Sequence, residues 1–157
     1  MTSPLALAVL VSGEGTTLDA LAEAIAGGHL PARIELVVAD RPHAPAIERA
    51  RRRGLATTVL PFRGISPAQW SEQLTALLRA RGVDLVLLAG FLAILPVPFL
   101  RAWGGRTINI HPALLPKHGG PGMYGRHVHE AVLRSGDRET GVSVHLATEE
   151  IDAGPIL

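Results

Sequence analysis

Residues 109–116 carry the side chains best suited to chemistry in this sequence. They read Asn-Ile-His-Pro-Ala-Leu-Leu-Pro and follow a short run, Arg-Thr-Ile, that predicts a buried strand. Residues two apart in a strand point to the same face, so Asn109 and His111 should lie side by side. An amide can donate to a developing oxyanion, and an imidazole can carry a proton near neutral pH. The alternative interpretation is that Asn109 and His111 are a structural pair at a strand end, with their hydrogen bonds made within the protein.

Pro112 cannot donate to a sheet ladder, so the strand should end near His111, at the edge where open α/β sheets bind ligands. Asp152 is the carboxylate best placed to join the pair, because it lies in a turn-rich segment after a later strand. Beside His111 it would favour the imidazolium form. Amide, imidazole and carboxylate together suit direct acyl transfer through a tetrahedral intermediate, with no covalent enzyme intermediate.

Alternating strands and helices predict an α/β fold, with a doubly wound, mostly parallel sheet and helices on both faces. We expect residues 1–157 to form a single domain. The last residues, 152–157, begin what resembles another strand, and we therefore expect the domain to be truncated at its C-terminus. Strands are expected at residues 5–11, 34–39, 57–60, 83–89, 107–111 and 139–147, and helices at 18–26, 46–53, 67–81, 98–103 and 127–134.

A glycine-rich turn joins the first strand to the first helix at residues 12–17, Ser-Gly-Glu-Gly-Thr-Thr. Free N–H groups at such a turn favour an anion, so Gly15, Thr16 and Thr17 are candidates for holding a phosphate. A dinucleotide site would need a third glycine where Leu18 stands, and a P-loop would need a Gly-Lys-Ser/Thr run. A plain strand-to-helix turn is the other interpretation.

Composition excludes several classes of function. The chain is 47% hydrophobic and 18% charged with a formal net charge of +1, which gives no strong field for nucleic acid or a membrane surface. No apolar run is long enough to span a bilayer. The absence of cysteine excludes disulfides, thiolate catalysis and a zinc ribbon, and fits a cytoplasmic protein.

Seven histidines invite a metal interpretation, but their spacing does not support it. His127 and His129 would diverge on a helix, and no carboxylate cluster accompanies them. His118 falls in a loop. His145 alternates with apolar residues in a strand and is interpreted as a satisfied structural group. We therefore expect no metal.

Four segments resemble the folate-dependent formyltransferases in order and spacing, and the similarity extends over essentially the whole chain. The resemblance is strongest to the purine-biosynthesis branch. It implies a formyltransferase-type Rossmann-like fold and transfer of the formyl group of 10-formyltetrahydrofolate to the amine of 5-phosphoribosylglycinamide. It also implies small-molecule substrates and a monomer or homodimer. The segments are residues 12–17, 88–91, 109–116 and 152–156.

By motif position, the resemblance assigns roles to individual residues. Asn109 would stabilise the oxyanion, His111 would be the proton shuttle, and Asp152 would hold His111. The phosphate of the substrate would lie on Gly15, Thr16 and Thr17. The residues implied in folate binding are Leu92, Ala93, Ile94, Leu95, Asn109, Thr148, Glu149, Glu150, Ile151 and Asp152.

The chain departs from the family pattern at several positions. Ala93 and Pro67 stand where relatives carry arginine, so the positive charge that would bind the folate glutamate tail is missing. Glu14 places an acidic side chain in the turn expected to bind the phosphate. Lys117, His118 and Arg126 are candidates to offset that missing charge. Two sister enzymes, formyltetrahydrofolate deformylase and methionyl-tRNA formyltransferase, are the alternative functions. A truncated folate-binding remnant is the non-enzyme alternative.

Overall fold

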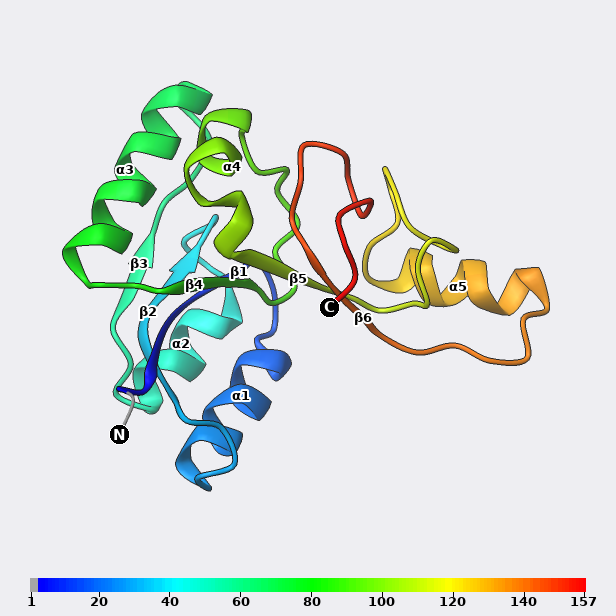
Figure 1. Cartoon of the computed structure of the whole chain (residues 1–157), viewed down its shortest axis with the longest axis horizontal. Coiled ribbons are helices and arrows are strands. Elements are labelled where there is room, and N and C mark those ends of the chain that lie inside the picture. Colours follow the sequence, from blue (N-terminus) through cyan, green and yellow to red (C-terminus); the bar gives the residue numbers. More distant parts are fainter. Residues whose placement is uncertain (1–2) are drawn as a thin grey trace.

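The computed structural model describes residues 3–157, which fold around one six-stranded sheet (Figure 1). The strands are β1 (Leu5–Val11), β2 (Ala32–Ala39), β3 (Thr57–Val59), β4 (Leu85–Leu88), β5 (Thr107–His111) and β6 (Ser143–Leu146). Their order across the sheet is β3-β2-β1-β4-β5-β6, and only β6 is antiparallel to its neighbour. The predicted doubly wound, mostly parallel sheet is confirmed.

Helices cover both faces of the sheet (Figure 1). They are α1 (Thr16–Ala26), α2 (Pro45–Arg52), α3 (Pro67–Ala80), α4 (Val97–Trp103), the 3₁₀ helix η1 (Gly104–Arg106) and α5 (Arg126–Ser135). One buried cluster joins the sheet to α1 and α2, and a second joins it to α3 and α4. Within the described residues, no helix is both long and apolar enough to cross a membrane.

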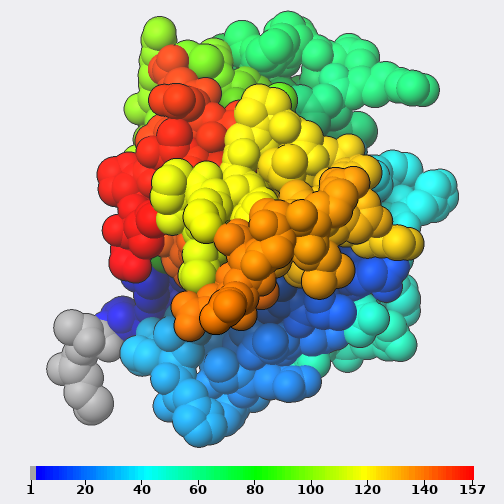
Figure 2. Space-filling model, turned by 90° about the vertical axis from the view of Figure 1, so that its right-hand side faces the viewer, coloured from blue at the N-terminus to red at the C-terminus, as the bar shows by residue number. Residues whose placement is uncertain are grey.

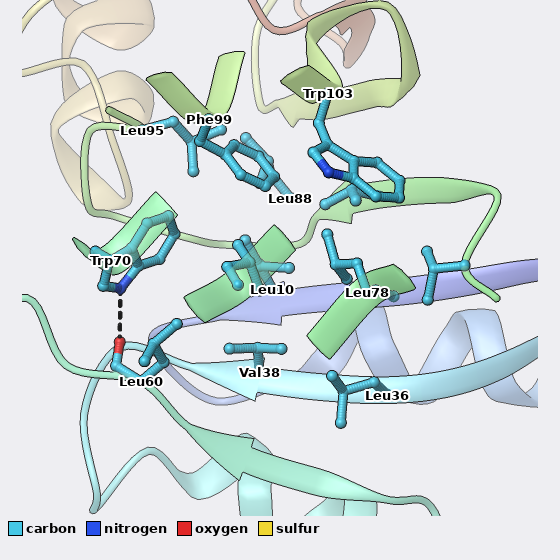
Figure 3. Close-up of a cluster of buried hydrophobic side chains, with 14 of the residues drawn as sticks. Leu10, Leu36, Val38, Leu60, Trp70, Leu78, Leu88, Leu95, Phe99 and Trp103 are labelled. Carbon is cyan, nitrogen blue, oxygen red and sulfur yellow. Dashed lines mark hydrogen bonds between the residues drawn. The ribbon is translucent and has the colours of Figure 1, made fainter. Parts of the chain in front are cut away.

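The core beneath α3 and α4 is built around aromatic side chains (Figure 3). Trp70 is fully buried, and its indole N–H donates to the carbonyl of Leu60 at 3.0 Å. Phe99 meets the Trp70 ring edge-on at 5.9 Å between centroids and stacks on Trp103. Buried aromatic rings supply a large apolar area, so this cluster fixes the segment that follows β4.

The last strand is shorter than the sequence pattern predicts. Residues 139–147 were expected in a strand, but β6 covers only Ser143–Leu146. The final pair of the β5–β6 ladder is His111 with Ser143, because Pro112 ends β5 there. Residues 139–142 therefore have no strand to pair with.

The strand order changes direction at β1, which pairs with β2 on one side and β4 on the other. The loops that leave β1 and β4 are tied together at this point. The Ser12 N–H donates to the Gly90 carbonyl at 3.1 Å, and the Leu92 N–H donates to Ser12 Oγ at 2.8 Å. In open α/β sheets such a switch point, at the carboxyl ends of the strands, is where ligands bind.

Candidate active site

Strand β5 delivers Asn109 and His111 to the same edge of the sheet. They alternate with Ile108 along the strand, and Ile108 packs against the core on the α1 and α2 side. His111 is 3% exposed, at the last residue of β5. The predicted juxtaposition of amide and imidazole on one side of a strand follows from the period of two.

Asp152 reaches this pair because the chain folds back after β6. The residue has a left-handed backbone, with φ of 56°. A Cβ on Gly154 would overlap the carbonyl of Leu146, so only glycine permits this close approach. The Leu146 N–H donates to the Pro155 carbonyl at 2.9 Å, which holds the returning segment along β6. The carboxylate is thereby turned over the end of β5.

Both oxygens of the Asp152 carboxylate face polar groups, and the side chain is only 9% exposed. Oδ2 lies 3.5 Å from His111 Nδ1 and accepts the Gly120 N–H at 3.0 Å. Oδ1 lies 3.5 Å from Asn109 Nδ2. A buried carboxylate is costly unless such donors surround it, so these contacts fix its position. The structure thus brings together the three residues proposed for chemistry.

His145 belongs to the same cluster, which the sequence interpretation missed. It is 2% exposed, and its Nδ1 lies 3.0 Å from the Leu146 carbonyl. Because a carbonyl only accepts, Nδ1 carries the hydrogen in the neutral ring, and Nε2 is an acceptor. Asn109 Nδ2 donates to this Nε2 at 3.1 Å. His145 therefore orients the Asn109 amide, and its register opposite Asn109 in the β5–β6 ladder is the signal that could have revealed it.

His111 has a second partner on the loop that follows β5. Its Nε2 donates to the carbonyl of His118 at 2.7 Å. The partner is an acceptor, so the hydrogen is on Nε2, and the other nitrogen faces Asp152. The ring is thus held from both sides, by a carbonyl and by a carboxylate.

The turn after β1 presents free backbone donors, as the sequence predicts. Gly15 precedes α1 in a left-handed conformation with φ of 81°, and no side chain caps the helix. Thr16 and Thr17 are exposed at its first positions. The first N–H groups of a helix lack internal partners, and the helix dipole adds positive potential there. The site is suited to a phosphate.

Glu14 does not oppose an anion at this turn. Its side chain is 71% exposed and lies 3.8 Å from Arg49, which helix α2 supplies. Arg49 and Arg53 also bind Asp19 at 2.7 Å each, and these hydrogen bonds, that of Arg53 first, hold the pKa of Asp19 below its usual value. The acid in the turn therefore points toward a cation and solvent.

The family profile described as formyl transferase matches residues 5–157. This chain belongs to the formyl transferase family. It is 41% identical to the chloroplastic phosphoribosylglycinamide formyltransferase of Arabidopsis thaliana, over 96% of this chain and 52% of that protein. It is 37% identical to the Escherichia coli K12 phosphoribosylglycinamide formyltransferase, over 96% of this chain and 69% of that protein.

Solved structures agree with this formyl transferase assignment. Glycinamide ribonucleotide transformylase 1 from Symbiobacterium toebii superposes with a TM-score of 0.90 at 35% identity, over all of this chain and 72% of that one. Phosphoribosylglycinamide formyltransferase from Coxiella burnetii superposes with a TM-score of 0.89 at 37% identity, over 98% of this chain and 70% of that one. The chain spans about half the length of the Arabidopsis relative.

The segment of the formyl transferase chain expected to bind folate after β4 is divided between surface and core. Leu92 and Ile94 are exposed, and Ala93 is half-buried. The Leu95 side chain instead packs in the core near Leu88 and Phe99 (Figure 3). Because the Leu95 side chain is buried, only the backbone of this residue can contact a ligand.

The second segment expected to bind folate, residues 148–152, forms a turn. The Thr148 hydroxyl donates to the Glu150 carbonyl at 2.9 Å, and Glu149 lies 3.7 Å from Arg101 on α4. Thr148, Glu149 and Glu150 are exposed, while Ile151 is half-buried. The ion pair between Glu149 and Arg101 joins this segment to α4, the helix that follows residues 92–95.

Of the two positions where arginine was expected, Pro67 has a local explanation, whereas nothing in the structure explains Ala93. Pro67 is the first residue of α3, where its missing N–H costs no hydrogen bond, and Ser66 and Gln69 form a capping box around it. The cations expected to compensate are already paired: Lys117 and His118 with Asp137, and Arg126 with Glu130.

Across residues 3–157, no group of three or more His, Asp or Glu side chains is arranged to hold a metal ion.

Proposed function

We propose that this chain transfers the formyl group of 10-formyltetrahydrofolate to the amine of 5-phosphoribosylglycinamide in purine biosynthesis. The observation that carries the proposal is the convergence of Asn109, His111 and Asp152 at the carboxyl end of β5. These groups supply an oxyanion donor, a proton carrier and a buried negative charge, which is the set that acyl transfer requires. The names of the relatives support phosphoribosylglycinamide as the acceptor, and the folate donor is what the resemblance to the formyltransferases implies.

In the proposed reaction the amine nitrogen attacks the formyl carbon, and the formyl oxygen becomes an oxyanion. Asn109 Nδ2 donates to that oxygen. Nδ2 donates to His145 Nε2 at 3.1 Å and to Asp152 Oδ1 at the longer distance of 3.5 Å, and in the proposed step the oxyanion takes the place of this more distant acceptor. A pre-oriented donor needs no reorganisation during the reaction, which is why it lowers the barrier.

Proton transfer completes the proposed step. His111 takes the proton that the amine loses on Nδ1, because Nε2 already carries the hydrogen that the His118 carbonyl accepts. It then delivers this proton to N10 of the folate, the bond between the formyl carbon and N10 breaks, and tetrahydrofolate leaves. Asp152 faces the ring at 3.5 Å and stabilises its imidazolium form while the proton is held. The turn at residues 15–17 would hold the substrate phosphate, and residues 92–95 and 148–152 would contact the folate.

The direct test is formyl transfer by this chain, followed through the absorbance change as 10-formyltetrahydrofolate is converted to tetrahydrofolate. The expected result is turnover that requires 5-phosphoribosylglycinamide and yields its formylated product. Folate conversion without the amine would instead identify water as the acceptor, as in the deformylase. Folate binding without any turnover would favour the non-enzyme alternative, and either result would overturn the proposal.

Replacing His145 tests whether it orients the Asn109 amide. In His145→Leu the Asn109 N–H loses its acceptor, which costs about 1–3 kcal/mol of unfolding free energy. Misplacement of the amide should lower kcat by up to about 10²-fold. His145→Gln is the matched control, because its side-chain carbonyl can still accept the hydrogen bond. Equal kcat in the two variants would argue against the orienting role.

Gly15→Ala tests the phosphate turn. A Cβ there would lie 2.7 Å from the Ala46 Cβ, and φ is +81°, so the turn must distort. Strain of this kind costs about 1–3 kcal/mol, and the KM for 5-phosphoribosylglycinamide should rise more than the KM for folate. Gly13→Ala is the steric control for stability, since nothing lies within 4 Å of its Cβ. If Gly15→Ala distorts the turn but leaves the KM for 5-phosphoribosylglycinamide unchanged, the phosphate does not bind at this turn.

A further inference from the structure

The loop between β5 and α5 holds two of the catalytic groups through its own backbone. The His118 carbonyl accepts from His111 Nε2 at 2.7 Å, and the Gly120 N–H donates to Asp152 Oδ2 at 3.0 Å. Gly119, between them, lies so close that a Cβ would be 3.3 Å from the Asp152 Cβ. Three consecutive residues thus fix both the imidazole and the carboxylate. Figure 2 shows this loop, in yellow, beside the C-terminal segment, in red.

The loop contains a residue whose backbone conformation is unfavourable unless other contacts stabilise it. His118 has φ of 56°, in the left-handed region that a non-glycine residue seldom occupies. This conformation turns its carbonyl toward His111. A residue persists in such a conformation only when contacts around it impose it. The contacts of the His118 side chain therefore impose this backbone conformation.

Asp137, just beyond the C-terminal end of α5, supplies that contact. Its Oδ2 lies 2.8 Å from His118 Nε2, and its Oδ1 accepts from Lys117 Nζ at 2.8 Å. Ser135 Oγ accepts from the Asp137 N–H at 3.3 Å and so orders the backbone at the carboxylate. Hydrogen bonds from Lys117 and then His118 hold the pKa of Asp137 well below its usual range, so it is ionised at neutral pH. One carboxylate thus anchors two adjacent loop residues.

We infer that Asp137 is a positioning residue for the proposed formyl transfer, acting through Lys117 and His118 to hold the loop carbonyl on His111. The inference rests on the proposed function for its kinetic consequence alone. Outer partners that fix the tautomer and orientation of a working histidine are worth about 10- to 100-fold in activity at metal sites, and the same geometry is present here. With Nε2 committed to the carbonyl, Nδ1 is the nitrogen left to face Asp152.

The test compares Asp137→Asn with a control on helix α5, which precedes Asp137. Asp137→Asn removes the charge that attracts Lys117 and His118, and kcat should fall by about tenfold with little change in either KM. Glu130→Gln is the control, because it removes a carboxylate that pairs with the exposed Arg126 at 3.4 Å. Its kcat should match that of the wild type. Lys117→Gln keeps the bond between Asp137 and His118, so its loss should be smaller than that of Asp137→Asn.

A second readout does not depend on turnover. Side-chain ¹⁵N NMR of the histidines reports which ring nitrogen carries the hydrogen, and wild-type His111 should show a hydrogen fixed on Nε2. In Asp137→Asn that signature should give way to a mixture of tautomers, and in Glu130→Gln it should persist. An Asp137→Asn protein that melts earlier but keeps both kcat and the His111 signature would overturn the inference. Should Asp137→Asn not fold, His118→Leu takes its place, because it removes the ring that Asp137 holds at 2.8 Å, and retention of both kcat and the His111 signature in this variant would overturn the inference.

The two proposals fail separately. A wild-type protein without formyl transfer would overturn the proposed function, while the NMR comparison would still test the anchoring of His111. Turnover in the wild type with an unchanged His111 signature in Asp137→Asn would overturn the anchoring alone.

Discussion

Asn109→Ala should lower kcat by about 10²–10³-fold, the loss expected when one oxyanion donor is removed. The side chain is the amide that the cluster directs toward the reacting centre, held by His145 at 3.1 Å. Because the donor acts on charge that develops in the transition state, the KM values should change much less than kcat. Steady-state kinetics with both substrates, measured on folded protein, check this.

Ile110→Val is the matched control for Asn109→Ala. It removes one methylene from the adjacent residue of β5, whose side chain leaves the opposite face of the strand. A similar fall in kcat in both variants would attribute the Asn109→Ala effect to disturbance of the strand. A kcat within threefold of wild type in Asn109→Ala would remove the oxyanion role.

Asp152→Asn should lower kcat by about 10²–10⁴-fold, the range for loss of general acid–base catalysis. The substitution keeps the volume and lets an oxygen still accept the Gly120 N–H, so the fold should survive. It removes the negative charge that faces His111 Nδ1 at 3.5 Å, and the imidazolium form loses its partner. Kinetics together with thermal unfolding separate the loss of chemistry from loss of structure.

Glu139→Gln controls for the loss of one negative charge away from the cluster of Asn109, His111 and Asp152. Glu139 is exposed on the segment that leads into β6, and its removal should leave kcat near the wild-type value. Full activity in Asp152→Asn would show that the carboxylate does not support His111. A fall in both variants would point to a general effect of charge.

Much of the fold follows from local patterns. Apolar runs and helix signals predicted the six strands and five α-helices of residues 3–157, with boundaries that differ by a few residues, but not the 3₁₀ helix η1. The β1 run of Leu5–Val11 is buried almost throughout, as its composition predicts. The exception is the long strand expected at residues 139–147, because strand length depends on a partner, and β5 ends at Pro112.

The sequence also predicts that Asn109 and His111 lie on the same face of a strand. The period of two and the proline that follows place both side chains on one face at a strand end. Asp152 was a candidate on turn chemistry and on the resemblance to the formyltransferases. The segment expected to bind folate was less well resolved, since no local pattern distinguishes the buried Leu95 from the exposed Ile94.

Local sequence patterns are sufficient to predict the order of the elements and the polar pair at the end of β5. Which distant groups complete the cluster depends on how the chain folds. His145 lies 36 residues from Asn109, and Asp137 lies 19 residues from His118. Such contacts depend on strand register and on loops folding back, whereas sequence periodicity reports only which face a residue takes. The side chains that hold the proposed catalytic groups in place are therefore visible only in the folded chain.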